Sequence, residues 1–247
     1  FAPTVVSRQP GSAMTTSGAK KVQLPRVSVS LQLEESEHDR SAARWVLEVG
    51  GKLTIFTGDA RQTLSSVGEL PASPFRVVEI ELKELPQVQD GDLACLQELV
   101  AIERLNLFGT GLTDAGMSHL QKLTNLQVLD ISQTNVNGEG LAHLADMHGL
   151  HTLISSYSTP FTNEGLSHLP SLRGLRTWHT DLRSPVSDEA LFYFQRLPNL
   201  EVLYIYQSDL TGEGLKHLSG LPALVDLKLQ TSRLDVNLAH LRDIPSL

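Results

Sequence analysis

The stretch IERLNLFGTGLTDAGMSHLQKL, residues 102–123, recurs along the chain and decides its fold. Counted from Ile102, apolar side chains stand at +3, +5 and +10 and again at +15, +18 and +21, and a hydroxyl stands at +8. The copy that begins at Leu126 matches at every one of these offsets. The early offsets alternate as the side chains of a strand do, whereas the last three form an apolar stripe of the kind that a helix buries.

The copies follow one another at a nearly constant step. Their first apolar position recurs at intervals of 24 or 25 residues: Val77, Ile102, Leu126, Leu150, Leu175, Leu200 and Leu224. One copy is too short to cover its own apolar stripe, so neighbouring copies have to stack and share both burial and sheet hydrogen bonds. The pattern therefore predicts a solenoid of about seven coils over residues 75–247.

This array resembles the leucine-rich repeat proteins. The likeness is greatest to a bacterial variety with copies of the form L-x-L-x-x-T-x-L-T-D-x-G-L-x-H-L, which is itself similar to the cysteine-containing subtype of ubiquitin-ligase receptors. The resemblance implies an α/β solenoid with a parallel sheet on its concave side and helices on its convex side. The copies that begin at Leu150 and Leu175, the third and fourth counted from Ile102, each carry an extra residue, so their register stays open by one position. Where the family has Asn or Cys at the turn, this chain has hydroxyls: Thr110, Thr134, Thr159, Ser184, Ser208 and Ser232.

Two segments precede the repeats. Residues 1–33 carry four basic and no acidic side chains, which predicts a flexible basic linker or tail, or else a basic arm that docks on an acidic partner. Residues 34–74 predict a cap for the first coil: a helix over 38–49 ended by Gly50, a strand over 52–56 and a second short helix around 61–67. The run ARWVLEVGG in this cap also resembles the segment before the repeats in such bacterial proteins, some of which carry a protein kinase upstream.

Composition narrows the class further. The chain of 247 residues is 40% hydrophobic but only 5% aromatic, and Cys95 is its single cysteine, so no internal disulfide is expected. We expect a soluble protein without a membrane span and leave its compartment open, the cytoplasm included. Residues 75–247 hold 12 basic and 21 acidic side chains, a net charge of −9, which disfavours nucleic acid as a partner. Because the chain begins with Phe1 rather than Met, we expect a piece of a longer protein.

Polar residues at the predicted helix starts have a structural interpretation. The following residues are expected to cap the helices whose starts they mark: Thr113, Asp114, Asn137, Thr162, Asn163, Ser187, Asp188 and Thr211. A second row recurs on the predicted helices and is expected to face solvent rather than to bind a metal: His119, His143, His168, His217 and His240. With no nucleophile and no phosphate-binding glycine loop in the pattern, we expect neither catalysis nor a cofactor.

The side chains that alternate with the buried strand positions point into the predicted concave face. Several are aromatic or charged, and we predict that they form a partner-binding patch; the alternative is that a solvated sheet simply tolerates them. Trp178 takes the place of a core leucine and is expected to pack inside. The predicted patch comprises Phe108, Asp130, His179, Asp181, Tyr204, Tyr206 and Lys228.

These observations favour a non-catalytic module that binds a protein or peptide partner on its concave face. One alternative is a regulatory or sensory repeat domain of a larger signalling protein, for example one with an upstream kinase. Another is a ubiquitin-ligase-like substrate receptor, which the lack of a visible adaptor-binding segment disfavours. The identity of the partner and the oligomeric state stay open.

Overall fold

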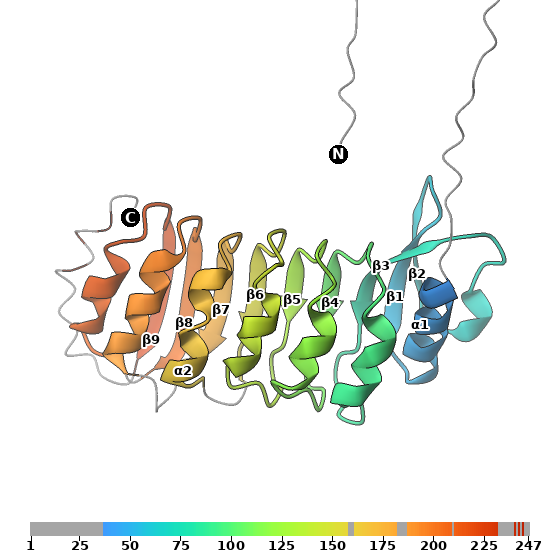
Figure 1. Cartoon of the computed structure of the whole chain (residues 1–247), viewed down its shortest axis with the longest axis horizontal. Helices are drawn as coiled ribbons and strands as arrows, with labels where there is room; N and C mark the ends of the chain where they lie inside the picture. Colours follow the sequence, from blue (N-terminus) through green and yellow to red (C-terminus); the bar gives the residue numbers. More distant parts are fainter. Residues whose placement is uncertain are drawn as a thin grey trace, which may run out of the picture. The chain divides into compact units, whose positions relative to one another are not determined.

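The computed structural model describes residues 37–157, 161–181, 187–208 and 210–231 together with residues 240, 242 and 244. Within these ranges the strands form a single sheet in the order β2-β1-β3-β4-β5-β6-β7-β8-β9, and the helical segments lie on one face of it (Figure 1). The predicted basic segment 1–33 lies outside the described residues, and the boundaries predicted at residues 33 and 74 stay predictions.

From β3 to β8 each strand is followed by a short helical segment and then by the next parallel strand. The strands and the 3₁₀ or α segments alternate along the chain as β3 (Arg76–Glu81), η2 (Asp90–Leu96), β4 (Arg104–Asn106), η3 (Gly116–Leu120), β5 (Val128–Asp130), η4 (Glu139–Leu144), β6 (Thr152–Ser155), α2 (Asn163–Leu166), η5 (Leu169–Ser171), β7 (Thr177–Asp181), η6 (Asp188–Arg196), β8 (Val202–Ser208), η7 (Gly214–Leu218) and β9 (Asp226–Thr231).

The strand register confirms the repeat. The predicted +3 positions pair with one another across all of the parallel strand pairs: Ile80, Leu105, Leu129, Leu153, Trp178, Leu203 and Leu227. The pairing of Leu153 with Trp178 and of Trp178 with Leu203 also resolves the register that the extra residues had left open. The extra residue of each coil is therefore absorbed outside the strand.

The convex helices that the family resemblance implies are mostly 3₁₀ helices. Met117, Leu120 and Leu123 are completely buried, and their spacing of three residues matches the three residues per turn of a 3₁₀ helix. The same spacing recurs at Leu141, Leu144 and Met147. A coil of 24 or 25 residues thus buries its stripe with one tight turn after another and needs no long α-helix.

Trp178 is completely buried in the core that runs through the coils, as predicted. Its ring stacks on Phe194 with centroids 5.1 Å apart, and Phe161 lies 5.9 Å away on a tilted plane. The indole Nε1 donates to the Ser155 hydroxyl at 3.0 Å. Ser155 and Thr180 both point inward, and Thr180 is completely buried with no hydrogen-bond partner for its hydroxyl in the described part of the chain.

The cap consists of α1 (Glu37–Glu48), β1 (Lys52–Phe56) and β2 (Arg61–Leu64), followed by the 3₁₀ turn η1 (Val67–Glu69). The helix and the first strand match the prediction, but the predicted second helix around residues 61–67 is wrong. β2 pairs antiparallel with β1 and covers the edge that β1 would otherwise expose. The pairing also lets the hydroxyls of Thr54 and Thr63 meet at 3.1 Å.

An ion pair attaches the cap to the first parallel strand. Asp39 of α1 is only 2% exposed and lies 3.0 Å from the guanidinium of Arg76. Its other carboxylate oxygen accepts the backbone N–H of Val77 at 2.7 Å. A buried carboxylate with both a charged and a backbone donor is well satisfied, and it sets the position of α1 over β3.

Asp114 caps the helical segment of the following coil, whereas the sequence predicted that it would cap its own. Asp114 accepts three backbone N–H groups of the next coil, from Asn137 at 2.9 Å, Gly138 at 3.1 Å and Gly140 at 2.6 Å. Asp90 and Asp188 make a related contact between coils: each accepts both the N–H and the hydroxyl of a threonine that precedes the helical segment of the next coil. Thr162 does cap its own helix, accepting from Gly165 at 2.9 Å.

The hydroxyls at the turn position face the backbone, as expected. Thr110 donates to the carbonyl of Leu107 at 2.8 Å, and Thr134 donates to that of Ile131 at 2.6 Å. Both are 4% exposed, so each hydroxyl satisfies a carbonyl that water cannot reach. Thr159, Ser184 and Ser232 lie outside the described residues, as does the side chain of Ser208.

Removing the carboxylate of Asp114 tests the contact between coils. We expect Asp114→Ala to lower the free energy of unfolding by about 2–4 kcal/mol, because three backbone amides lose a charged acceptor at once. Urea unfolding followed by circular dichroism measures the change. Asp146→Ala is the matched control, since Asp146 is exposed; equal losses in the two variants would contradict the assigned role.

The unpartnered hydroxyl of Thr180 tests the polar part of the core. Thr180→Val keeps the shape of the side chain and removes the buried hydroxyl, so we expect a gain of about 1 kcal/mol in unfolding free energy. Ser155→Ala should do the opposite and lose about 1–2 kcal/mol, because the Trp178 indole loses its acceptor. Thermal melts of both variants decide the matter, and a destabilised Thr180→Val would mean that the hydroxyl has a partner.

Candidate functional site

The face of β3–β9 turned away from the helical segments carries a continuous row of side chains, and we name it the open face. Each member of its middle row pairs in register with the next: Glu81, Asn106, Asp130, Ile154, His179, Tyr204 and Lys228. Alternation along the strands sends these residues outward because the +3 residues before them point inward. The row brings together Asp130, His179, Tyr204 and Lys228 of the predicted patch.

The C-terminal part of this row is a stack of three side chains. The rings of His179 and Tyr204 are nearly parallel, at 13°, with centroids 4.4 Å apart. The ammonium of Lys228 lies 3.8 Å from the centroid of the Tyr204 ring. Tyr206 meets Tyr204 edge to face at 6.3 Å. Parallel stacking, edge contact and a cation over a ring are each favourable for aromatic side chains, so the stack holds its own geometry.

Asp226 completes the stack, although the sequence reasoning did not select it as a site residue. The Tyr204 hydroxyl donates to Oδ2 of Asp226 at 2.5 Å. Asp226 lies on β9 next to Val202, and its position on the open face follows from the same alternation that identified its neighbours. The signal was therefore present in the pattern, but nothing local indicated that the carboxylate would reach Tyr204.

The charges around the stack alter two pKa values. Partial burial lowers the pKa of His179 below its usual 6.5, the charge of Lys228 lowers it further, and Asp226 and Asp130 oppose the shift. The hydrogen bond with Tyr204 raises the pKa of Lys228, and the nearby Asp226 acts in the same direction. The lowered pKa favours the neutral imidazole of His179, and the raised pKa favours the ammonium of Lys228.

Asp181 was predicted to face a partner, but its side chain is nearly buried. It is 6% exposed, and its carboxylate turns back to the preceding coil, where Oδ2 accepts the N–H of Tyr157 at 2.6 Å. The N–H of Tyr157 lies in the turn after β6 and needs an acceptor. Asp181 supplies that acceptor from the neighbouring strand. Asp181 consequently supports the open face from within and offers a partner little of its surface.

Phe108 lies apart from the stack. It follows β4, three strands away from β7, and its ring is half-buried with Lys83 above it at 5.3 Å.

Asp130 accepts the N–H of Ser132 at 2.9 Å, just as Asn106 accepts that of Phe108 in the coil before. Asn106 and Asp130 therefore face outward and also accept a backbone N–H just after their own strands, β4 and β5.

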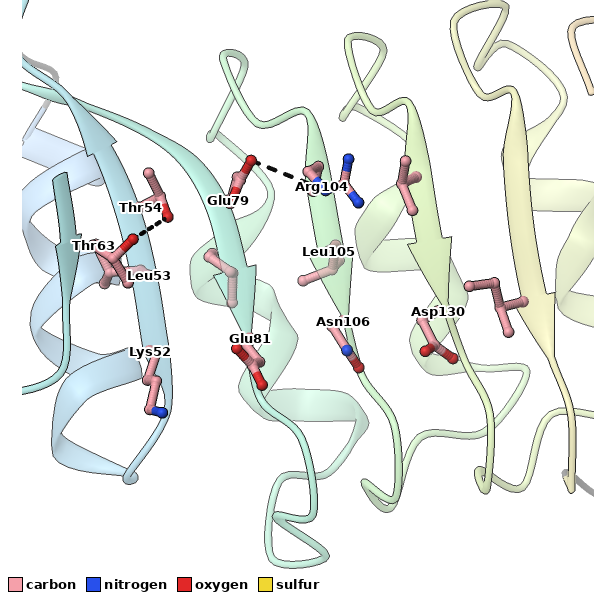
Figure 2. Close-up of a pocket in the computed structure, with 13 residues that line it drawn as sticks. Lys52, Leu53, Thr54, Thr63, Glu79, Glu81, Arg104, Leu105, Asn106 and Asp130 are labelled. Atoms are coloured by element: carbon pink, nitrogen blue, oxygen red, sulfur yellow. Dashed lines mark hydrogen bonds and ion pairs between the residues drawn. The ribbon is translucent and has the colours of Figure 1, made fainter. Parts of the chain in front are cut away.

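The N-terminal part of the open face contains a shallow hollow over β1, β3, β4 and β5 (Figure 2). Acidic Glu79, Glu81 and Asp130 line it together with basic Lys52 and Arg104. Glu79 is held by two guanidinium groups, Arg61 at 3.4 Å and Arg104 at 4.0 Å. The sequence reasoning placed no binding residue here except Asp130, and the hollow shows that the open face changes from charged to aromatic along the coils.

The predicted histidine row lies on the helical side. His119 contacts the side-chain amide of Gln97, and His217 lies 3.4 Å from that of Gln195. No group of three or more His, Cys, Asp or Glu side chains converges in the part of the chain that the structure describes. Cys95 takes the place of the histidine in an earlier coil. Burial raises the pKa of Cys95 to about 11, so its thiol stays protonated at neutral pH.

Comparison with known proteins agrees with this geometry. A family model described as a leucine-rich repeat matches residues 122–145. Among solved structures, internalin C2 from Listeria monocytogenes superimposes with a TM-score of 0.52 at 16% sequence identity, over 73% of this chain and 76% of that one. The fold is a leucine-rich-repeat solenoid. The search of curated proteins finds no match.

The leucine-rich-repeat solenoid thus presents an open face with two unlike ends, a mixed-charge hollow over β1–β5 and an aromatic stack over β7–β9. Neither end is an enclosed cavity. Among the helices that the structure describes, none is long and apolar enough to cross a membrane. Such a surface is suited to extended contact with another macromolecule.

The titration of His179 tests the electrostatics of the stack. We expect an NMR titration to place the pKa of His179 below 6.5, and Lys228→Gln to raise that pKa, because it removes the nearby positive charge. The neutral imidazole is favoured in the folded state, so its contribution to stability is present above pH 6.5 and is lost as the pH falls through the lowered pKa.

Lys216→Gln is the control for this titration, because Lys216 is exposed on the helical side in η7. It should leave the pKa of His179 unchanged. A pKa at or above 6.5 in the parent protein, or the same rise in both variants, would contradict the stacked arrangement.

Proposed function

We propose that this protein is a non-catalytic interaction module that binds a protein or peptide partner through its open face. The observation that carries the proposal is the stack of His179, Tyr204 and Lys228 with Tyr206 beside it. Aromatic side chains provide most of the binding energy in many interfaces, because they bury a large area with little loss of conformational entropy. The other occupants of the open face supply a polar surround.

The size of the face also supports the proposal. Seven parallel strands at about 4.8 Å spacing span roughly 29 Å from β3 to β9, with two or three outward side chains on each. This is comparable to one side of a standard protein interface. The outward aliphatic residues Val128, Ile154 and Val202 are half-buried on this face, the first two in the lining of the hollow and the third beside Asp226 of the stack. A partner could therefore contact apolar surface at the centre and charged surface at the rim.

The double variant Tyr204→Ala/Tyr206→Ala tests the proposal. We expect it to reduce capture of a partner from an extract of the source organism by tenfold or more, because each lost aromatic anchor costs about 1–2 kcal/mol of binding. Quantitative mass spectrometry compares proteins retained by the parent and variant chains. The melting temperature should change by only a few degrees, since both tyrosines lie on the surface of the sheet.

Phe192→Ala is the matched control. Phe192 is an exposed aromatic residue on the helical side, 43% accessible, with Arg196 above its ring. This variant should capture the same proteins as the parent chain. The proposal fails if the double variant retains every captured protein, or if Phe192→Ala loses the same ones.

A further inference from the structure

One aromatic residue of the open side stands outside the stack in a strained conformation. Tyr157 follows β6, is 59% exposed and has a φ of +58°. Bulky residues rarely adopt this left-handed conformation, because Cβ then crowds the following carbonyl oxygen. The equivalent residues of the two preceding coils, Gln133 and Gly109, have φ values of +54° and +69°. The turn is thus a property of the repeat, and in this coil it displays a tyrosine ring.

Asp181 is what holds this turn. Its carboxylate accepts the Tyr157 N–H at 2.6 Å from a nearly buried position on β7. Asp181 also pairs in register with Tyr206 of β8. Asp181 therefore lies between the turn that carries Tyr157 and the strand that carries Tyr206, which are two strand positions apart, or about 10 Å. We name Tyr157 and Tyr206 together the tyrosine rim.

Three other accessible aromatic rings indicate what the rim would bind. Lys83 lies over Phe108, Arg196 over Phe192 and Lys228 over Tyr204, at 3.8–5.7 Å from the ring centroids. Tyr157 and Tyr206 have no cation over their rings among the described residues. They stand on a repeat array of net charge −9, from 12 basic and 21 acidic side chains. Ring faces in an acidic setting attract cations.

We propose that the tyrosine rim receives arginine side chains from a basic segment of the partner protein, and that Asp181 positions the Tyr157 turn for this contact. The inference rests on the proposed function and specifies its partner chemistry. Arginine is favoured over lysine because the planar guanidinium stacks on an aromatic ring and is less strongly hydrated than an ammonium. The acidic array draws the segment in, and the rim selects among cations.

Binding of octa-arginine and octa-lysine to the whole chain, followed by isothermal titration calorimetry at physiological salt, tests the rim. The parent chain should bind octa-arginine more tightly than octa-lysine. Tyr157→Asn removes the ring but tolerates the left-handed turn, and we expect it to weaken octa-arginine binding about twofold to fivefold. Tyr157→Phe keeps the ring and should bind within about twofold of the parent chain, as should the helical-side control Phe192→Ala.

Asp181 needs a test that separates its position from its charge. Asp181→Asn and Asp181→Ala both remove the negative charge, but only the asparagine keeps an oxygen that can accept the Tyr157 N–H. We expect Asp181→Asn to bind octa-arginine more tightly than Asp181→Ala. Hydrogen exchange at the Tyr157 amide should be faster in Asp181→Ala alone. Equal binding and equal exchange in the two variants would remove the positioning role.

The inference is overturned if octa-arginine and octa-lysine bind alike, or if Tyr157→Asn and Phe192→Ala give the same affinity as the parent chain. That result leaves the proposed function standing when Tyr204→Ala/Tyr206→Ala still abolishes capture of the natural partner. If the peptide results hold and the capture experiment fails, the rim is a cation site that is not part of a protein interface. The peptide experiment can therefore contradict the inference about the rim without contradicting the proposed function, and the capture experiment can do the reverse.

Discussion

A single coil of this protein cannot satisfy its own backbone, and every other feature depends on the next coil doing so. The N–H groups of Leu107 and Gly109 donate to carbonyls of the following coil, Asp130 and Ser132, at 2.8 and 2.9 Å. At the helical end the carboxylate of Asp114 caps the next coil. The contact is so close that a Cβ on Gly140 would lie 2.9 Å from the carbonyl oxygen of Asp114, which leaves glycine as the residue that fits there.

This dependence explains which parts of the fold could be read from the pattern. Burial and strand register repeat with each coil, so a spacing of 24 or 25 residues was enough to predict most of them. The pairing of Leu153 with Trp178 had to come from the structure, because an extra residue left the register open there. The cap has no repeat to support it. Residues 61–64 form a strand because β1 offers them an open edge, and that long-range pairing is not visible in four residues of mixed polarity.

The candidate site likewise has some features that the sequence pattern predicted and others that it did not. Alternation along a strand correctly placed His179, Tyr204 and Lys228 on the outer surface, because direction depends only on parity. It could not show that Asp181 turns toward Tyr157 or that Asp226 reaches Tyr204, since those contacts depend on how far a side chain extends across coils. The direction of the Asp114 cap was missed for the same reason: an acid at a helix start can serve its own helix or a neighbouring one.

The coils that carry the aromatic stack are also those that depart from the repeat inside. Trp178 replaces a leucine and donates to the hydroxyl of Ser155. Ser155 and Thr180 bury hydroxyls at the strand position where the coil of β8 buries Ile205. The left-handed turn that recurs along the repeat carries an exposed tyrosine here, Tyr157, and a nearly buried carboxylate accepts its N–H. None of these features improves stacking, because coils with plain leucines already stack in the same sheet. Local departures that weaken a fold tend to mark where it acts, and here they converge on β6–β8, beneath and beside the rings that we assign to partner binding.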